Sequence, residues 1–387
     1  MPLSLPRPIL AANLARSHSP AYSMFVRVLL HLLTATYFLW SQVASRLQRH
    51  RSFRVTRAAG LGGGTSRDEG DKSPGTGDRI SGHGDVSSQR EAMSARFKDA
   101  PTPAVNTRKR KLDPTAYTVG WICALRIEHF AARPLFDEEH VGPEALTGIR
   151  DFEYTLGRVG EHNVVIVVMP EACSNAASIA AQHLSYSFPN IQFGLMVGIG
   201  GGAPSQKHDI RLGDIVVGVP RGDKHGVLQY DMGKTMQDGS LHITGFLNPP
   251  PIFLRNAVDR LQFQYEIPGQ QLQLTINNIL SRNPRLQTFK RPHASADRLY
   301  QAEVTHPPGT ASCETSRGNE PMKLVLRHER VPFENDPAVH YGVIASASQV
   351  VRNAFIRDKL AEKNILCFEM EAAGLISHFS CLVIRST

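Results

Sequence analysis

Residues 193–205 read FGLMVGIGGGAPS, an apolar run that ends in a cluster of glycines, Gly198, Gly200, Gly201 and Gly202. The apolar part is the right length for a buried strand, and glycines after it let backbone amides approach an anion or a sugar closely. The run does not match G-x-G-x-x-G, and no GKS or GKT follows, so dinucleotide-binding and P-loop interpretations are weak. Taken alone, the glycines fit a tight turn equally well.

Similar short apolar runs lie on both sides of this stretch. The sequence predicts strands at 117–125, 154–157, 164–169, 194–199, 215–219, 343–345 and 382–384, and helices at 127–136, 176–186 and 352–363. Strands that alternate with helices and are apolar throughout indicate an α/β sheet covered on both faces. Residues 269–337 are polar and rich in proline, which indicates an excursion from that sheet.

The first 57 residues differ from the rest in composition. Residues 24–44 (MFVRVLLHLLTATYFLWSQVA) form the only strongly apolar stretch of this part, and its uninterrupted section is shorter than the roughly 20 residues that cross a bilayer. A tilted membrane helix or signal anchor, a mitochondrial transit peptide, an interfacial helix and an irrelevant extension all stay open. Membrane contact by residues 24–44 is therefore one hypothesis, and the compartment stays unassigned.

Residues 58–115 are rich in Gly, Ser, Asp and Arg and contain few apolar side chains. Such a segment cannot bury enough surface to offset the entropy lost on ordering, so we expect a disordered linker. The run Arg108 to Lys111 fits a nuclear localisation signal, but a solvated linker is the simpler interpretation. The folded domain is expected to begin at residue 116 and to run to 387.

Charge and cysteine content exclude two classes of protein. Of the 43 Lys and Arg residues, nine lie in residues 1–67, which hold no acid, and the remaining 34 nearly match the 35 Asp and Glu residues. The main domain therefore lacks the basic surface of a nucleic-acid-binding protein. The five cysteines are widely spaced and form no C-x-x-C pair, which argues against a disulfide framework or zinc ribbon and for an intracellular, reducing compartment.

Two carboxylate motifs lie at predicted strand ends, where ligands bind in such sheets. Glu128 follows the strand that ends near Leu125, and a carboxylate there usually caps a helix. Glu369 and Glu371 flank Met370 after another apolar run, so we expect one acid to point into a cavity and the other to be solvated. A carboxylate in the cavity can accept both hydroxyls of a ribose.

Seven blocks resemble, in order, the superfamily of nucleoside phosphorylases and methylthioadenosine/S-adenosylhomocysteine nucleosidases. They are YTVGWICALRIEHFAA, YTLGRVGEHNVVIV, FGLMVGIGGGAPS, DIRLGDIVVGVP, SADRLYQAEVTHP, HYGVIAS and CFEMEAAGL, within residues 117–387. The chain is most similar to the divergent branch found as the front module of longer multidomain proteins. The resemblance implies a three-layer α/β/α sandwich around a mixed, partly barrel-like sheet.

The resemblance also assigns roles to individual residues. Glu128 is similar to the glutamate that positions the attacking water in the nucleosidases, and Met370 and Glu371 to the pair that lies under the sugar and accepts its hydroxyls. Gly198, Gly200 and Gly201 resemble the loop beside ribose and phosphate.

Three further residues and one segment complete the expectations for the site. Val351 is placed among the substrate-binding residues, and Asp214 in a structural turn after the glycine loop. Arg211 is a candidate for phosphate, although a surface role explains it better. Residues 225–231 border the site without an assigned role.

The chain departs from the family at three places. Residues 346–350 replace a pattern with Gly-Asp and a base-stacking Phe, and residues 170–174 replace a glycine-rich loop on the phosphate side with one that carries Glu171. The family's acid at the base nitrogen is an aspartate shortly after the strand matching residues 381–385, so we expect it beyond Thr387, with the domain incomplete at its C-terminus.

Two functions follow from this resemblance. The first is binding of a purine nucleoside or nucleotide and cleavage of its N-glycosidic bond by phosphate or water, with no metal or organic cofactor. The second is a catalytically inactive nucleoside-sensing or interaction module from a larger signalling protein. The partners expected are a small-molecule nucleoside, phosphate and a second copy of the chain, and no nucleic acid.

Overall fold

The computed structural model describes residues 109–142, 152–238, 241–266, 269, 272–282, 294–306, 318, 320–331 and 337–387. The apolar stretch at 24–44 and most of the linker predicted at 58–115 lie outside these residues. Residues 109–115, the end of that linker, are described: Lys111 pairs with Val141, and a 3-10 helix spans Pro114–Ala116. Within the described residues, no helix combines the length and apolarity needed to cross a bilayer.

A mixed sheet of 12 described strands forms the centre of the fold. Its strands are β1 (Val119–Cys123), β2 (Glu138–Glu139), β3 (Tyr154–Val159), β4 (His162–Val168), β5 (Phe193–Ile199), β6 (Gly201–Gly202), β7 (Ile215–Gly218), β8 (Val227–Thr235), β9 (Leu241–Phe246), β10 (Val339–Ser346), β11 (Ile365–Glu369) and β12 (Cys381–Ser386). The order is β2-β3-β4-β1-β5-β12-β7-β10-β11-β6, with β8 paired to β10 and β9 to β8. Every strand expected from the apolar runs is present.

The sheet curls back on itself at the glycine cluster. β5 lies in the middle of the order, between β1 and β12, whereas β6 pairs antiparallel with β11 at the far end. Because only Gly200 separates β5 from β6, the middle and the end of the sheet must meet there. The predicted barrel-like part of the sheet is therefore confirmed, and it is closed by the residues quoted first above.

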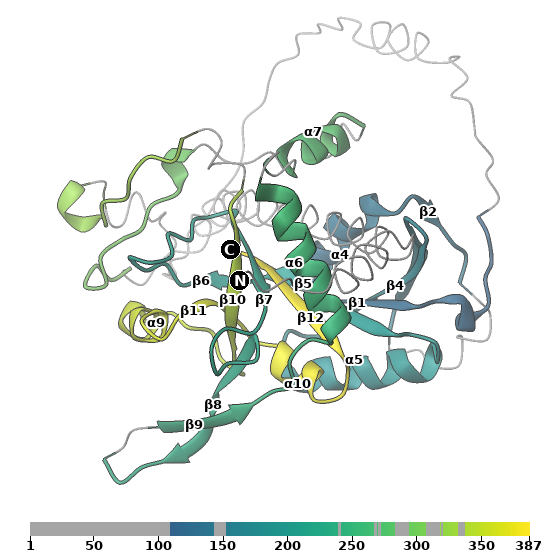
Figure 1. Ribbon diagram of the computed structural model, residues 1–387, viewed down its shortest axis with the longest axis horizontal. Helices are drawn as coiled ribbons and strands as arrows, with labels where there is room; N and C mark the ends of the chain where they lie inside the picture. The colour runs from purple at the N-terminus through teal and green to yellow at the C-terminus, as the bar shows by residue number, and fades with distance from the viewer. Residues whose placement is uncertain are drawn as a thin grey trace, which may run out of the picture. The chain divides into compact units, whose positions relative to one another are not determined.

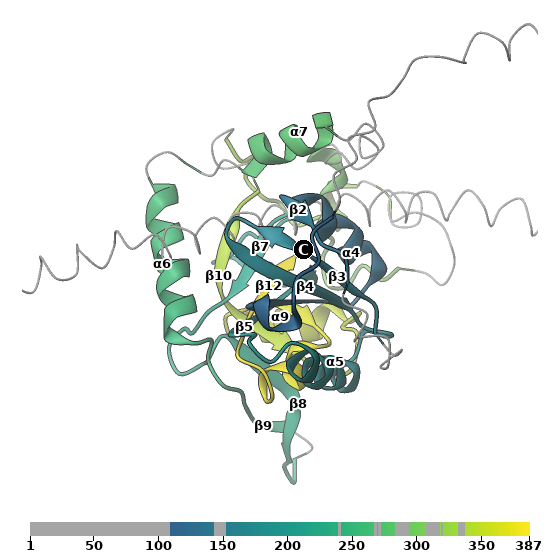
Figure 2. The ribbon, with the colours of Figure 1, turned by 90° about the vertical axis from the view of Figure 1, so that its right-hand side faces the viewer.

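Helices cover both faces of the sheet, which confirms the three-layer arrangement. They are α4 (Arg126–Ala132), α5 (Ser174–Ser187), α6 (Ile252–Glu266), α7 (Leu272–Arg282), α9 (Ala354–Ala361) and α10 (Ala372–Ile376). Alternate residues of one strand face opposite layers: Leu195 packs in a cluster with α4, α6 and α7, and Met196 in a cluster with α5 and α10. α5 lies beside α10 (Figure 1) and away from α6 and α7 (Figure 2).

Small side chains bring α5 close to the segment that follows β11. A Cβ added at Gly374 would overlap the carbonyl of Ser174, so only glycine fits at this crossing. Ser178 Oγ donates to the carbonyl of Gly374 at 2.7 Å, and Ser174 Oγ donates to the carbonyl of Met370 at 3.0 Å. The first turn of α5 therefore fixes the backbone at Met370.

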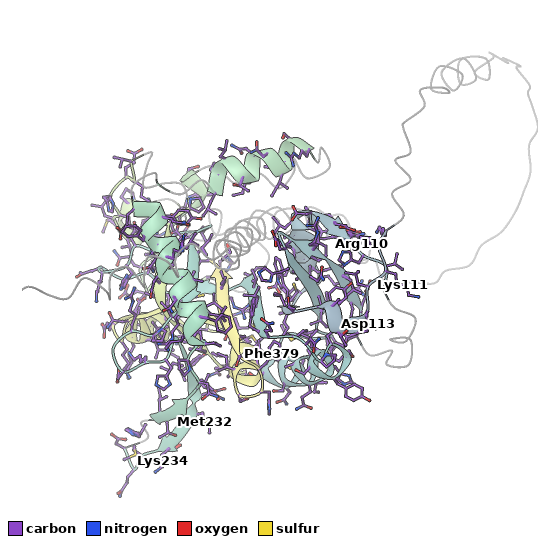
Figure 3. All side chains as sticks on the ribbon, turned by 45° about the vertical axis from the view of Figure 1, so that its right-hand side comes forward. Arg110, Lys111, Asp113, Met232, Lys234 and Phe379 are labelled. Carbon is purple, nitrogen blue, oxygen red and sulfur yellow. The ribbon has the colours of Figure 1, made fainter. Side chains whose placement is uncertain are left out.

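The hairpin of β8 and β9 and the helices α6 and α7 were not expected from the sequence. The hairpin carries Met232 and Lys234 away from the sheet (Figure 3), and both side chains are exposed. α7 lies inside the predicted excursion at 269–337, yet its Leu272, Ile276 and Leu280 are buried in the core. That part of the excursion is thus a structural helix.

Candidate functional site

A cavity of about 1270 Å³ opens where the strand ends meet the glycine cluster. Five segments and Ala172 line it. The segments are the turn from β1 into α4, residues 199–202, the 298–306 segment, the 349–357 segment, and the turn from β11 into α10. These segments lie far apart in sequence and converge at one edge of the sheet, as expected for α/β folds. The volume exceeds the roughly 300–1,000 Å³ typical of small-molecule pockets.

Glu128 joins two of these segments through its carboxylate. Its Oε2 accepts hydrogen bonds from the amides of Ala124 and Leu125 at 2.6 and 3.0 Å, and its Oε1 accepts from the amide of Ile199 at 2.9 Å. The side chain is 2% exposed and lines the cavity. Glu128 therefore caps the start of α4, as the simpler interpretation expects, and also holds the end of β5 beside the cavity.

Glu369 and Glu371 converge on one buried arginine, Arg385 of β12. Arg385 Nη2 donates to Glu371 Oε2 at 2.9 Å and to Glu369 Oε2. Glu369 Oε2 also accepts from the amides of Glu371 and Ala372 at 3.2 and 2.9 Å, which orders the turn into α10. The expectation that one of the two acids is solvated is wrong, because both are buried and both line the cavity.

The cluster holds three carboxylates against one guanidinium, and its titration follows from that imbalance. Burial raises the pKa of Glu371 to about 7, and the neighbouring Glu369 and Glu128 add to the rise while Arg385 opposes it. Burial also raises the pKa of Glu128, against the opposing effects of Arg385 and the backbone amides. A carboxyl group whose pKa lies near neutrality exchanges a proton within the physiological range.

The glycine at position 198 lies directly against this cluster. A Cβ added there would overlap Arg385 Nη1 and lie 2.5 Å from Glu128 Oε1. Gly200 is similarly constrained, because a Cβ there would overlap Cys367 Sγ, whereas a Cβ at Gly201 meets nothing within 4 Å. Gly200 and Gly201 line the cavity, whereas Gly198, also predicted to bind substrate, is not among its lining residues and lies against Glu128 and Arg385.

Gly198→Ala is expected to lower the free energy of unfolding by about 1–3 kcal/mol, the usual result of overpacking a filled site. Gly201→Ala, the matched control, is expected to change it by no more than about 0.5 kcal/mol. Urea denaturation of the two variants measures the difference. Equal losses in both would show that the side chains of Glu128 and Arg385 do not constrain position 198.

The other predicted site residues fall into two groups. Met370 and Val351 line the cavity together with Glu128 and Glu371, although more than 200 positions separate the two carboxylates in sequence. Asp214 is buried elsewhere and accepts from Arg330 and His340, which agrees with the structural role expected for it. Arg211 pairs with Asp209.

Two further expectations concern the edges of the site. Glu171 is exposed, and its neighbour Ala172 lines the cavity instead. Within residues 225–231, Asp231 Oδ2 accepts from the amide of Ser348 at 3.0 Å and the Tyr230 hydroxyl donates to the carbonyl of Gln349 at 3.4 Å. The β8 strand thus supports the 349–357 side of the cavity.

Sequence reasoning missed Arg385, and it placed the 298–306 segment within a family block, SADRLYQAEVTHP, without naming any of its residues as site residues. Arg385 is fully buried within an otherwise apolar strand, a pattern that signals a buried ion pair, but its partners are not adjacent in sequence. Across the described ranges, no group of three or more His, Cys, Asp and Glu residues is arranged to hold a metal ion.

Comparisons with known proteins find a similar protein by sequence and similar solved structures by fold. No family model matches the chain. An NLR-like protein (nucleotide-binding leucine-rich repeat) from Hyaloscypha variabilis is 38% identical over 279 residues, which cover 72% of this chain and 27% of that protein. The chain thus spans about a quarter of the length of the curated relative it matches.

Among the solved structures, a methylthioadenosine/S-adenosylhomocysteine nucleosidase from Neisseria meningitidis is 14% identical, with a TM-score of 0.40 over 70% of this chain and 84% of that one. The corresponding Helicobacter pylori enzyme is 16% identical, with a TM-score of 0.39 over the same shares. A futalosine hydrolase from H. pylori is 15% identical, with a TM-score of 0.38 over 70% of this chain and 88% of that one.

Proposed function

We propose that residues 116–387 form a nucleoside phosphorylase-like domain that binds a purine nucleoside or nucleotide and cleaves its N-glycosidic bond. The observation that carries the proposal is the convergence of Glu128 and Glu371 on one cavity beside the glycine cluster. The seven sequence blocks, which predicted both residues, support it independently.

The chemistry of glycosidic cleavage suits the charges of this cavity. As the bond to the base breaks, positive charge develops on the ribose ring, so carboxylates near the sugar stabilise the transition state more than the ground state. Glu371 is the proposed acceptor for the ribose hydroxyls, and Arg385 orients its carboxylate. Glu128, held by three backbone amides, is the proposed residue that positions the nucleophile.

The charges also favour particular ligands. Glu128, Glu369 and Glu371 outnumber Arg385 in the buried cluster. Their negative charge would repel phosphate, so it favours water as the nucleophile. Arg298, Arg352 and Arg357 also line the cavity, and their charges favour a ligand that itself carries a phosphate group. The proposal therefore includes hydrolysis of the N-glycosidic bond of a nucleotide as well as that of a nucleoside.

A second function is a nucleoside-sensing module without catalysis. Two observations favour it: the match to an NLR-like protein of which the chain spans only 27%, and the replacement of the family's pattern at residues 346–350. In this function, ligand occupancy of the same cavity would be the signal.

Incubation of the full chain with adenosine, inosine, methylthioadenosine and their available nucleotides, with and without phosphate, separates the two functions. The expected result is release of free base without added phosphate. Binding by calorimetry with no release would support sensing instead. Neither binding nor release by well-folded protein would contradict both.

A further inference from the structure

Residues 298–306 form one side of the cavity, through Arg298 to Ala302 and Val304 to His306. They run beside residues 323–325: the amide of Gln301 donates to the carbonyl of Lys323 at 2.9 Å, and the amide of Val325 donates to that of Leu299 at 2.8 Å. We call residues 297–306 the wall segment. An isolated bridge between Tyr300 and Leu324 joins the two segments, a pairing that is barely stable alone, and Met322 and Leu326 beside it are 91% and 97% exposed. The position of the wall segment must therefore be fixed by other contacts.

Arg327 supplies the first of these contacts, at the base of the wall segment. Its Nη2 donates to Asp297 Oδ2 at 2.8 Å and to the Asp297 carbonyl at 3.1 Å, and its Nη1 lies 3.4 Å from Asp209 Oδ1. One guanidinium thus ties the wall segment to the loop that follows the glycine cluster. The side chain is 14% exposed, so solvent weakens these ion pairs less than it would at an open surface.

Arg330 supplies a second, indirect contact: it anchors to the core the segment 323–330, whose residues 323–325 run beside the wall segment. Its Nη1 and Nη2 donate to the two oxygens of Asp214 at 2.8 and 2.7 Å. Asp214 is fully buried and also accepts from His340 Nε2 at 2.9 Å and from the amide of Ala338 at 3.1 Å. The two-point pairing of a planar guanidinium with a buried carboxylate fixes orientation as well as distance.

The electrostatics of Asp214 agree with a permanent contact. Burial alone would raise the pKa of Asp214, but hydrogen bonds from Arg330 and His340 lower it below its ordinary value. The carboxylate is therefore ionised throughout the neutral range, and so is Arg330, whose pKa is raised by Asp214 against the effect of burial. Separating the pair would take the guanidinium away from a fully buried carboxylate, which is unfavourable.

We propose that Arg327 and Arg330 clamp the wall segment onto the loop at residues 209–214 and so make it a fixed, specificity-determining side of the cavity. The two arginines are positioning residues that act through the wall segment. The wall segment contributes two apolar residues, Leu299 and Val304, and two hydrogen-bonding residues, Gln301 and Thr305, to the lining of the cavity. When their positions are fixed, such a mixture can distinguish bases by their hydrogen-bonding edges. This role rests on the proposed function, whereas the clamp itself does not.

Arg327→Ala in the full chain tests the clamp by hydrogen exchange. Peptides that contain the amides of Gln301 and Val325 are expected to exchange about tenfold faster, while peptides from α5 stay unchanged. Arg133→Ala is the matched control, because it removes another arginine–carboxylate pair, with Glu139, outside the cavity. Asp297→Asn, which keeps the side-chain shape, should also speed the exchange of the same amides, by a smaller factor. Unchanged exchange in both clamp variants would overturn the proposal, whatever the protein binds.

The same Arg327→Ala protein then tests ligand choice. The ratio of kcat/KM for adenosine to that for inosine, or of their Kd values if no base is released, is expected to change at least about fivefold, through KM and not kcat. A fall in kcat at constant KM, or an unchanged ratio, would overturn the role in specificity. If the unaltered chain neither binds nor cleaves any nucleoside, the proposed function and the role in specificity both fail, and the exchange measurement alone decides the clamp.

Discussion

Glu371→Ala is expected to reduce base release by about 10³-fold, the scale observed when a preorganised group that stabilises transition-state charge is removed. The side chain lies in the cavity, its Oε2 is fixed by Arg385 at 2.9 Å, and it is proposed to accept the ribose hydroxyls. The same change should weaken nucleoside binding by about tenfold or more, because a hydrogen bond to a charged group is lost. Base release by chromatography and binding by calorimetry measure the two effects.

The folded state should tolerate this substitution, which makes the result interpretable. Arg385 keeps Glu369 as a partner, and the lost carboxyl group is one whose pKa burial raises to about 7. Removing it relieves a charge that the fold disfavours at neutral pH. Glu139→Ala, at the sheet edge opposite Arg133, serves as the control and should leave activity unchanged. Undiminished base release by Glu371→Ala would rule out the proposed role of this carboxylate.

Much of the sheet could be predicted because its strands are apolar on both faces. Runs such as 164–168 and 382–384 are too uniformly apolar for a surface position, and the structure buries them between two helical layers. The hairpin of β8 and β9 lacks this signal, because the outer half of β8, from Asp231 to Thr235, is exposed on both faces. Its pairing depends on tertiary position and not on local composition.

The helix α7 was missed for a different reason. Leu272, Ile276 and Leu280 follow one another at four-residue spacing and are all buried, which is the pattern of an amphipathic helix. The polar, proline-rich residues that follow it dominated the composition of the whole 269–337 stretch. Residues 272–282 taken alone have the periodicity that predicts the helix.

The site was predicted where its residues belong to local motifs and was missed where they do not. Glu128 and Glu371 each follow an apolar strand, so their placement at the sheet edge follows from topology. Arg385 lies inside a strand, and its partners Glu369 and Glu371 precede it by 16 and 14 residues. The apolar residues before it indicate a buried position, but its partners cannot be identified locally, because the two acids reach it only in the folded sheet.

Arg385→Met is expected to lower the free energy of unfolding by about 3–5 kcal/mol at pH 8, as happens when one partner of a buried ion pair is removed. Methionine fills most of the volume, so the loss comes mainly from the three carboxylates left without their cation. Urea denaturation followed by fluorescence of the buried Trp121 measures the change. Arg133→Met, at an exposed pair, should cost about 1 kcal/mol or less.

The destabilisation caused by Arg385→Met should depend on pH, and the raised pKa values of the carboxyl groups determine whether it grows or shrinks as pH rises. Burial already holds the pKa of Glu371 near 7 and that of Glu128 above its ordinary value, and losing Arg385 raises both further. A carboxyl group whose folded pKa exceeds its unfolded pKa loses stabilisation as pH rises between the two values. The difference between Arg385→Met and the unaltered chain should therefore be smaller at pH 5 than at pH 8.

Removing the charges of Glu369 and Glu371 in the same protein completes the test. The variant Arg385→Met with Glu369→Gln and Glu371→Gln should regain most of the lost stability at pH 8, because a neutral, well-packed set often matches a buried ion pair in stability. It should also show a smaller pH dependence than the single variant, because Glu128 alone of the three carboxylates remains, and it should stay inactive. A loss that is equal at both pH values, or that the two glutamine substitutions do not relieve, would show that Arg385 stabilises the sheet by packing and not by balancing the carboxylates of the cavity.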